Sequence, residues 1–217
     1  NLAFSLMFFS AAAGQAPRND MYRLVHEAGR FADANGFSAV WLPERHFHSF
    51  GGPYPNPAVL AASLATVTRS VRLRAGSIVL PLHHPVHVAE TWSMVDNLSG
   101  GRVELGFGSG WNPNDFVLSP DTFADAKQVF RDRIEAVRRL WRGDAVALPN
   151  GMREQVETRI FPLPIQPEVP VWIAATGNPD TFAWAGAAGF NILTMLLGGD
   201  IGDIAPKVAL YRAARRD

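Results

Sequence analysis

Six short apolar runs alternate with six helix-like segments along this chain, and that alternation limits the folds open to it. The strand-like runs occupy residues 3–9, 39–42, 72–80, 103–107, 171–175 and 190–195. The helical patterns occupy residues 21–32, 57–69, 85–98, 123–141, 179–188 and 201–215. Three of these have proline near the first turn, and Asn35-Gly36 forms a C-terminal cap for the first. Strands that alternate with helices predict βαβ units and therefore a parallel sheet.

Polar residues gather where two of the apolar runs end. One group lies within residues 41–47 (WLPERHF), and the other lies within residues 76–111. Barrels of the α/β class build their active sites from such loops, at the carboxyl ends of parallel strands. We therefore predict an α/β fold, a (β/α)8 TIM barrel, whose catalytic face carries both groups.

The number of units leaves the architecture open. About six βα units are visible, whereas a closed barrel has eight and about 250 residues. The alternatives are an open doubly wound sheet, a barrel whose last strands are missing, and a barrel completed by another chain. The absent initiator Met and the helical end favour the second, a single barrel domain over residues 1–217 that is C-terminally incomplete. An excursion at residues 144–170, with a candidate strand at 158–161, separates the fourth helix from the fifth strand.

Charge and composition argue against several classes of partner. Twenty basic residues balance twenty acidic ones, and no basic run exceeds two, so neither nucleic acid nor an anionic membrane surface is expected. The absence of cysteine excludes disulfides and thiolate metal sites, which fits a cytoplasmic location. Residues 2–14 read as a first strand or as the apolar core of a signal peptide; no basic residue precedes them, which favours the strand. No apolar stretch approaches the roughly 20 residues of a membrane span.

Four segments together resemble the luciferase-like flavin monooxygenase superfamily, whose members are (β/α)8 barrels. They are WLPERHF, AGSIVLP leading into HHPVHVAE, VDNLSGGRVELGFGSGW, and PVWIAATGNPDTFAWAGAAGFNIL. The variant PERHFHSFGG further resembles the subgroup associated with nonribosomal peptide and polyketide assembly lines. The resemblance covers residue 4 to the end and keeps the order of the segments.

The resemblance implies an FMN-dependent two-component monooxygenase. Such an enzyme receives reduced FMN from a separate flavin reductase, forms a flavin C4a-peroxide with oxygen, and hydroxylates a small-molecule or carrier-protein-tethered substrate. Relatives commonly form homodimers. The alternatives are an F420-dependent hydride-transfer enzyme of the same superfamily, a metal-dependent hydrolase on a similar barrel, and a non-catalytic flavin-binding protein.

Glu44, Arg45 and His46 are the predicted catalytic residues. In bacterial luciferase the matching stretch has two adjacent histidines; here Arg45 takes the first position and His46 matches the second. Arginine does not exchange protons near neutral pH but can hold an anion. His46 is therefore the acid–base candidate. Alternatively, a structural Glu–Arg or Glu–His pair fixes the loop.

Two glycine-containing segments are predicted to lie against the flavin ring. Gly76-Ser77 matches a small-residue pair that forms a non-prolyl cis peptide under the ring in luciferase, although both residues could simply pack near the barrel axis. The GFGSGW segment has the wrong spacing for a dinucleotide loop, so we expect Gly108, Ser109 and Trp111 to border the flavin. Luciferase has a phosphate-binding Arg at the position of Ser109.

Without that arginine, the FMN phosphate is expected at Thr176, Gly177, Asn178 and Thr181. There a strand ends, Pro179 begins a helix, and free N–H groups with the helix dipole form an anion site. The capping role is expected to fall to Asp180.

Several remaining polar residues have less specific interpretations. Arg102 precedes the fourth strand and is expected to form a structural salt bridge. His83 and His87, spaced by four, could bind a metal with Glu90, but we predict no metal because Pro85 begins a helix among them. His48 is expected to be an exposed loop residue.

Overall fold

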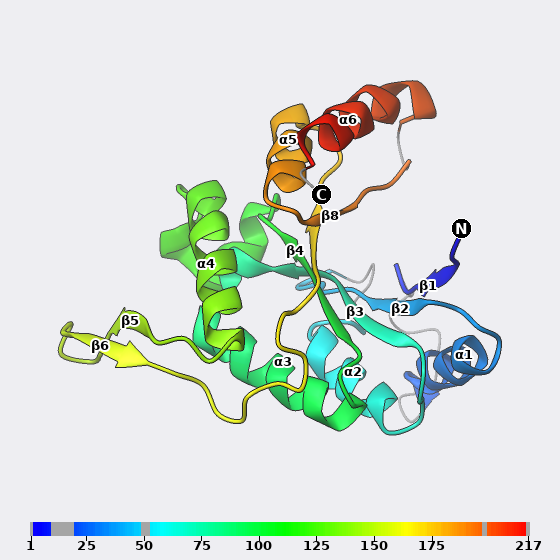
Figure 1. Cartoon of the computed structure of the whole chain (residues 1–217), viewed down its shortest axis with the longest axis horizontal. Coiled ribbons are helices and arrows are strands. Elements are labelled where there is room, and N and C mark those ends of the chain that lie inside the picture. Colours follow the sequence, from blue (N-terminus) through cyan, green and yellow to red (C-terminus); the bar gives the residue numbers. More distant parts are fainter. Residues whose placement is uncertain (1, 10–19, 49–52, 197–198, 216–217) are drawn as a thin grey trace.

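Six parallel strands form one curled sheet (Figure 1). The computed structural model describes residues 2–9, 20–48, 53–196 and 199–215. The sheet order is β1-β2-β3-β4-β7-β8. These strands are Ser5–Met7, Ala39–Leu42, Arg72–Val79, Val103–Gly108, Val171–Ala174 and Asn191–Leu193. All six expected strands are confirmed, with ends that differ from the predicted ones by at most two residues.

Helices connect these strands. In the described part of the chain they are α1 (Arg23–Ala34), α2 (Pro57–Ala65), α3 (Pro85–Ser99), α4 (Ala126–Trp141), α5 (Pro179–Ala187) and α6 (Ile201–Ala214). Short 3₁₀ turns occur at η2 (Leu80–Leu82), η3 (Pro113–Leu118) and η4 (Pro120–Thr122).

Several helix ends follow the capping rules. Proline occupies the first turn of α2, α3 and α5, where its missing N–H is not needed. Asn35 is the C-cap of α1, and Gly36 follows it with φ of 72°. Gly100 ends α3 in the left-handed conformation that favours glycine.

The strand order selects the barrel architecture over the open doubly wound sheet. A doubly wound sheet reverses its strand order at a switch point, whereas here each strand of the main sheet pairs with the next in sequence. Fully buried Leu73 and Ala75 alternate along β3 with the more exposed Arg72 and Arg74. One face of the sheet therefore packs on helices and the other lines the inside of a partial (β/α)8 barrel.

The excursion at residues 144–170 contains an antiparallel hairpin, β5 (Val146–Pro149) and β6 (Gln155–Thr158), which projects beside α4 (Figure 1). The prediction of a strand at residues 158–161 was wrong. Pairing with β5 ends at Thr158, and Ile160 is buried in the core with no exposed surface.

One buried carboxylate ties the return of this excursion to the barrel. Asp96 of α3 accepts hydrogen bonds from the backbone N–H groups of Ile165 and Gln166, at 2.8 and 2.9 Å. The Gln166 side-chain amide also donates to Asp96, at 2.7 Å.

Arg102 is structural, as expected, but it forms no salt bridge among the described residues. Its buried guanidinium donates to the carbonyl oxygens of Ser99, Val71, Ala65 and Thr68, and to the Thr68 hydroxyl. Burial lowers the pKa of Arg102. The side chain ties the ends of α2 and α3 together at the amino end of the sheet.

The amino-terminal segment contains a strand, which confirms the first of the two interpretations given above. Residues 5–7 pair in parallel with residues 39–41 of β2, while residues 10–14 of the signal-peptide alternative lie outside the described part. No described helix has both the length and the apolar character needed to cross a membrane.

Candidate active site

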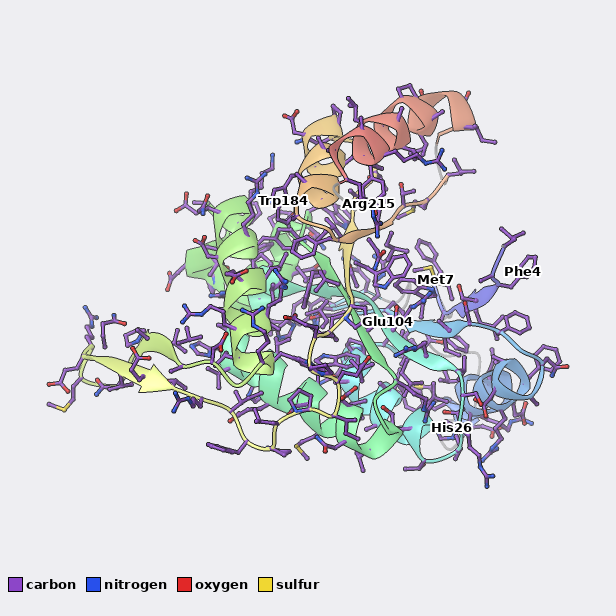
Figure 2. All side chains as sticks on the ribbon, viewed as in Figure 1. Phe4, Met7, His26, Glu104, Trp184 and Arg215 are labelled. Atoms are coloured by element: carbon purple, nitrogen blue, oxygen red, sulfur yellow. The ribbon has the colours of Figure 1, made fainter. Side chains whose placement is uncertain are left out.

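A charged and aromatic cluster fills the inner face of the sheet near its middle. Glu104 of β4 accepts a hydrogen bond of 2.7 Å from Arg74 Nε and another of 2.7 Å from Trp172 Nε1. The Arg74 guanidinium lies 4.9 Å from the Trp41 ring centroid and 4.6 Å from that of Trp172. In Figure 2 the Glu104 side chain lies on the side of the sheet away from α4. Arg72 Nε also lies 3.5 Å from Glu104 Oε1, so two cations and one indole N–H compensate this buried carboxylate.

This cluster was not predicted from the sequence, although a signal for it was present. Charged residues stand at alternate positions of two otherwise apolar strands, at Arg72, Arg74 and Glu104. Because strand side chains alternate between faces, this spacing places Arg72 and Arg74 on one face of their strand, and the register that pairs Arg74 with Glu104 brings the third charge to the same face. The cluster therefore joins β2, β3, β4 and β7 on the inner face, before the polar loops at their carboxyl ends.

Small residues follow this cluster toward the carboxyl ends of β3 and β4. The peptide bond between Gly76 and Ser77 is cis, as the resemblance implied. A Cβ on Gly106 would lie 2.3 Å from the carbonyl oxygen of Ala75, so only glycine fits there. A Cβ on Gly108 would lie 3.0 Å from Ser77 Oγ. The glycines therefore let the β3 and β4 backbones lie close together, and the Trp41 ring packs over them: a Cβ on Gly76 would lie 3.0 Å from it and one on Gly106 would lie 3.6 Å from it.

The segment after β4 leads into the 3₁₀ turn η3 and not into an α-helix, whereas a dinucleotide-binding loop opens a helix. Gly110 has φ of 78°, and a Cβ there would strike the Phe116 ring at 2.9 Å. Trp111 is 80% exposed, so most of its indole surface is available to a ligand. His48 is exposed, as predicted, and Asn112 Nδ2 lies 2.9 Å from its Nε2 atom.

Glu44 is the centre of a second polar cluster, at the carboxyl end of β2. Its side chain is 1% exposed. Oε1 lies 2.6 Å from His46 Nε2 and 2.5 Å from His83 Nε2, and Oε2 accepts a 2.9 Å hydrogen bond from the Val79 N–H. The Glu–His pair that the sequence left open is therefore present, and His83, from the loop after η2, joins it.

Glu44 and His46 shift each other's pKa values. Burial acts to raise the pKa of Glu44, but the hydrogen bonds from His46, His83 and Val79 together hold it below its ordinary value of 4.5. The hydrogen bond to Glu44 raises the pKa of His46 above its ordinary value of 6.5, against the effect of burial. Glu44 is thus held as a carboxylate, and His46 is held more readily as a cation.

The Arg45 side chain lies against the Phe9 ring. Its backbone N–H donates to the Tyr54 carbonyl at 2.8 Å, and its guanidinium lies 5.2 Å from the centroid of the Phe9 ring. The positive charge therefore lies between the end of β1 and the loop after β2, beside the cluster centred on Glu44.

The described residues do not support the metal site formed by His83, His87 and Glu90, because the ligand atoms that converge belong to Glu44, His46 and His83. Tetrahedral zinc with bonds of about 2.0–2.1 Å separates its ligand atoms by about 3.3 Å. The two nitrogen–oxygen distances here, 2.6 and 2.5 Å, are much shorter than that separation and are hydrogen-bond contacts.

The segment predicted to hold a phosphate begins α5. Asn178, and not Asp180, is the N-cap: its side chain accepts from the Asp180 N–H at 2.9 Å. Thr181 N–H bonds the Asn178 carbonyl at 3.1 Å, so two N–H groups of the first turn are already used. Lys207 of α6, which the sequence analysis did not select, donates to the Thr176 carbonyl at 3.0 Å and brings a cation to this loop.

The predicted site residues thus form three groups along one edge of the sheet. Register pairs Val79 with Gly108 and Phe107 with Ile173, so the carboxyl ends of β3, β4 and β7 lie side by side. The cluster centred on Glu44, the surface formed by β3 and β4, and the Thr176–Thr181 loop follow this edge in that order.

Two grooves flank that edge. The first, of about 580 Å³, lies between the loop before α3 and the β5–β6 hairpin and is lined in part by His83 and His87. The second, of about 680 Å³, is mostly apolar and runs along α6 and the segment after β8. In Figure 2 Trp184 lies between α5 and α4, where it packs 6.1 Å from the Phe130 ring.

Comparison with known proteins gives a consistent set of relatives. The family described as luciferase-like monooxygenase matches residues 2–217. The oxygenase component of flavin-dependent trigonelline monooxygenase from Acinetobacter baylyi is 33% identical over 206 residues, or 92% of this chain and 56% of that protein. An F420-dependent glucose-6-phosphate dehydrogenase from Amycolatopsis mediterranei is 35% identical over 192 residues, or 83% of this chain and 54% of that protein. The chain therefore spans about half the length of these curated relatives.

Among solved structures, the monooxygenase RslO1 from Streptomyces bottropensis is similar over 98% of this chain and 65% of its own. The two share 28% sequence identity and a TM-score of 0.88. The curled parallel sheet described above is therefore a large part of the barrel found in such proteins.

Proposed function

The chain belongs to the luciferase-like monooxygenase family, and we propose that it provides the flavin-binding part of a two-component monooxygenase. In this proposal reduced FMN comes from a separate flavin reductase, and an organic substrate is hydroxylated with molecular oxygen. The relative from Acinetobacter baylyi is itself named as an oxygenase component, which supports the two-component arrangement.

The observation that supports this proposal most directly is the glycine-rich carboxyl end of β3 and β4, next to the cluster centred on Glu44. In the proposal the isoalloxazine ring lies against Gly76-Ser77 and the glycines of β4, and the Glu104 cluster lies below it. When bound, the reduced flavin supplies the two electrons with which oxygen is activated. These residues suit reduced FMN, because its ring needs a flat, partly apolar surface with a positive charge nearby.

The protein residues take the following roles. Glu44 fixes the His46 ring through Nε2, which leaves Nδ1 as the ring nitrogen that exchanges a proton with substrate. Arg45 supplies positive charge for an anionic flavin or substrate. Ser109 and Trp111 border the ring, and the Thr176–Thr181 loop, with Lys207 beside it, holds the phosphate.

An F420-dependent hydride transfer is the second candidate, because one relative with 35% identity uses that cofactor. The two candidates differ in their use of oxygen. We also propose a carrier-tethered substrate, a homodimer and a cytoplasmic location, each resting on the sequence alone.

Anaerobic titration with reduced FMN, followed by mixing with oxygen, tests the main proposal. We expect saturable binding and protein-dependent kinetics of flavin reoxidation, with oxygen consumed. Binding of reduced F420 in place of reduced FMN would transfer the assignment to the second candidate. Absence of binding for both cofactors would contradict both candidate functions.

A further inference from the structure

The Glu104 cluster contains two cations and one anion on the inner face of the sheet. Arg74 Nε lies 2.7 Å from Glu104 Oε2, and Arg72 Nε lies 3.5 Å from Glu104 Oε1. The side chains of Glu104 and Arg74 are 9% and 13% exposed, whereas that of Arg72 is 40% exposed. One positive charge is therefore in excess, and water screens Arg74 and Glu104 less than Arg72.

The Trp41 ring connects this cluster with the glycines that follow it. Trp41 is 5% exposed and pairs in register with Arg74, whose guanidinium lies 4.9 Å from the centroid of the ring. The same ring lies 3.0 Å from the position of a Cβ on Gly76 and 3.6 Å from that of a Cβ on Gly106. Alternate residues of a strand are about 6–7 Å apart, so the Arg74 charge lies about one side-chain layer below Gly76-Ser77.

We propose that the excess positive charge of the Glu104 cluster gives the site its preference for reduced over oxidised FMN. Arg74 and Glu104 act through the Trp41 ring, as positioning residues that set the electrostatic potential at Gly76-Ser77. The inference rests on the function proposed above, because that function places the flavin ring against this peptide. A two-component oxygenase needs such a preference, since the reduced cofactor is the form that it receives and that reacts with oxygen.

The reduced and oxidised cofactors share the phosphate and differ in the charge of the ring. Reduced FMN carries a negative charge near N1, whereas the oxidised ring is neutral, and protein charges near N1 and N5 tune this difference. A unit charge at about 8–10 Å, in an effective dielectric constant of about 20, changes the affinity for an anion roughly 15- to 30-fold. Solvent at the open edge of the site screens part of this effect, so we expect about 10-fold.

A cluster that only stabilises the fold makes a different prediction. Removing either partner of a buried ion pair leaves the other uncompensated, which would disturb the Trp41 ring and weaken the binding of both forms of FMN. The electrostatic role predicts opposite effects for the two partners. Loss of the Arg74 charge disfavours the reduced form, and loss of the Glu104 charge favours it.

The test measures the dissociation constants of oxidised FMN and, under anaerobic conditions, of reduced FMN. Their ratio cancels the contributions of the phosphate and of packing that both forms share. Arg74→Met should shift the ratio about 10-fold against reduced FMN, and Glu104→Gln should shift it about as far in its favour. A 10-fold change in this ratio equals about 30 mV in the two-electron potential of the bound flavin, which is a second readout.

Three further variants serve as controls. Arg74→Lys keeps the positive charge and should keep a ratio close to that of the wild-type protein, although the stacking on Trp41 changes. Arg139→Met removes an exposed cation of α4 and should leave the ratio unchanged. The double variant Arg74→Met/Glu104→Gln leaves neither partner of this pair charged and keeps one positive charge in the cluster. It should return the ratio toward that of the wild type, and it carries the test with Glu104→Gln if Arg74→Met does not fold.

Failure of this inference and failure of the proposed function give different results. Shifts of the same sign in Arg74→Met and Glu104→Gln, or equal changes in both dissociation constants, would overturn the inference and leave the proposed function intact. A wild-type protein that binds oxidised FMN as tightly as reduced FMN would do the same. A wild-type protein that binds neither form would overturn the proposed function and the inference with it.

Discussion

Replacing Glu44 by glutamine tests the electrostatics of the site most directly. The substitution keeps the size of the side chain and removes its charge. Glu44 accepts three hydrogen bonds in a position that is 1% exposed, and two of the donors are imidazoles. Glutamine offers one acceptor oxygen and an NH₂ group that would face at least one donor.

The expected loss of stability follows from these contacts. Hydrogen bonds to charged groups contribute about 1.5–3 kcal/mol each, and removing one partner of a buried pair costs about 3–5 kcal/mol. Glutamine also relieves the desolvation of a buried carboxylate, which offsets part of that loss. We therefore expect Glu44→Gln to lower the free energy of unfolding by about 2–4 kcal/mol.

The pH dependence of that loss has a definite sign. The lowered pKa of Glu44 contributes stability above its ordinary value of 4.5, and this is lost as pH falls through the folded-state value. The raised pKa of His46 contributes stability below its ordinary value of 6.5, and this is lost as pH rises through the folded-state value. The difference between wild type and Glu44→Gln should thus be largest from pH 4.5 to 6.5.

Urea unfolding followed by tryptophan fluorescence measures this difference at several pH values. NMR titration should show the pKa of His46 falling in Glu44→Gln, because its main stabilising partner is gone. Equal unfolding free energies across the pH range, with an unchanged His46 pKa, would refute the assignment of Glu44 as the charged centre.

Three further substitutions test other parts of the structure by urea unfolding. Arg102→Met leaves four buried carbonyl acceptors without their donor and should cost about 3 kcal/mol or more; an unchanged midpoint would contradict the role of this arginine. Gly106→Ala places a Cβ 2.3 Å from the Ala75 oxygen and should cost about 1–3 kcal/mol and weaken binding of reduced FMN. Gly177→Ala, with no atom within 4 Å of the added Cβ, is its control and should be near neutral in stability. Asn178→Ala removes the N-cap of α5 and should cost about 1 kcal/mol, so full stability would argue against that cap.

The sequence by itself determined the elements and their order. Apolar periodicity, proline in first turns and the Asn35-Gly36 cap act within a few residues, so they can be read without knowing what packs where. The same local rules identify Asn178 as the N-cap before Pro179, a signal that was present and was assigned to Asp180 instead. The cis peptide at Gly76-Ser77 was predicted only through resemblance.

Only the tertiary structure decided which side chains meet. Glu44 and His83, Arg74 and Glu104, and Thr176 and Lys207 are 30 or more residues apart in each pair. Their contacts depend on the register of neighbouring strands and on how a helix packs after its strand, and a shift of one residue would turn a side chain to the opposite face of the sheet. Local sequence patterns contain no information about that register, so the composition of the site followed from packing.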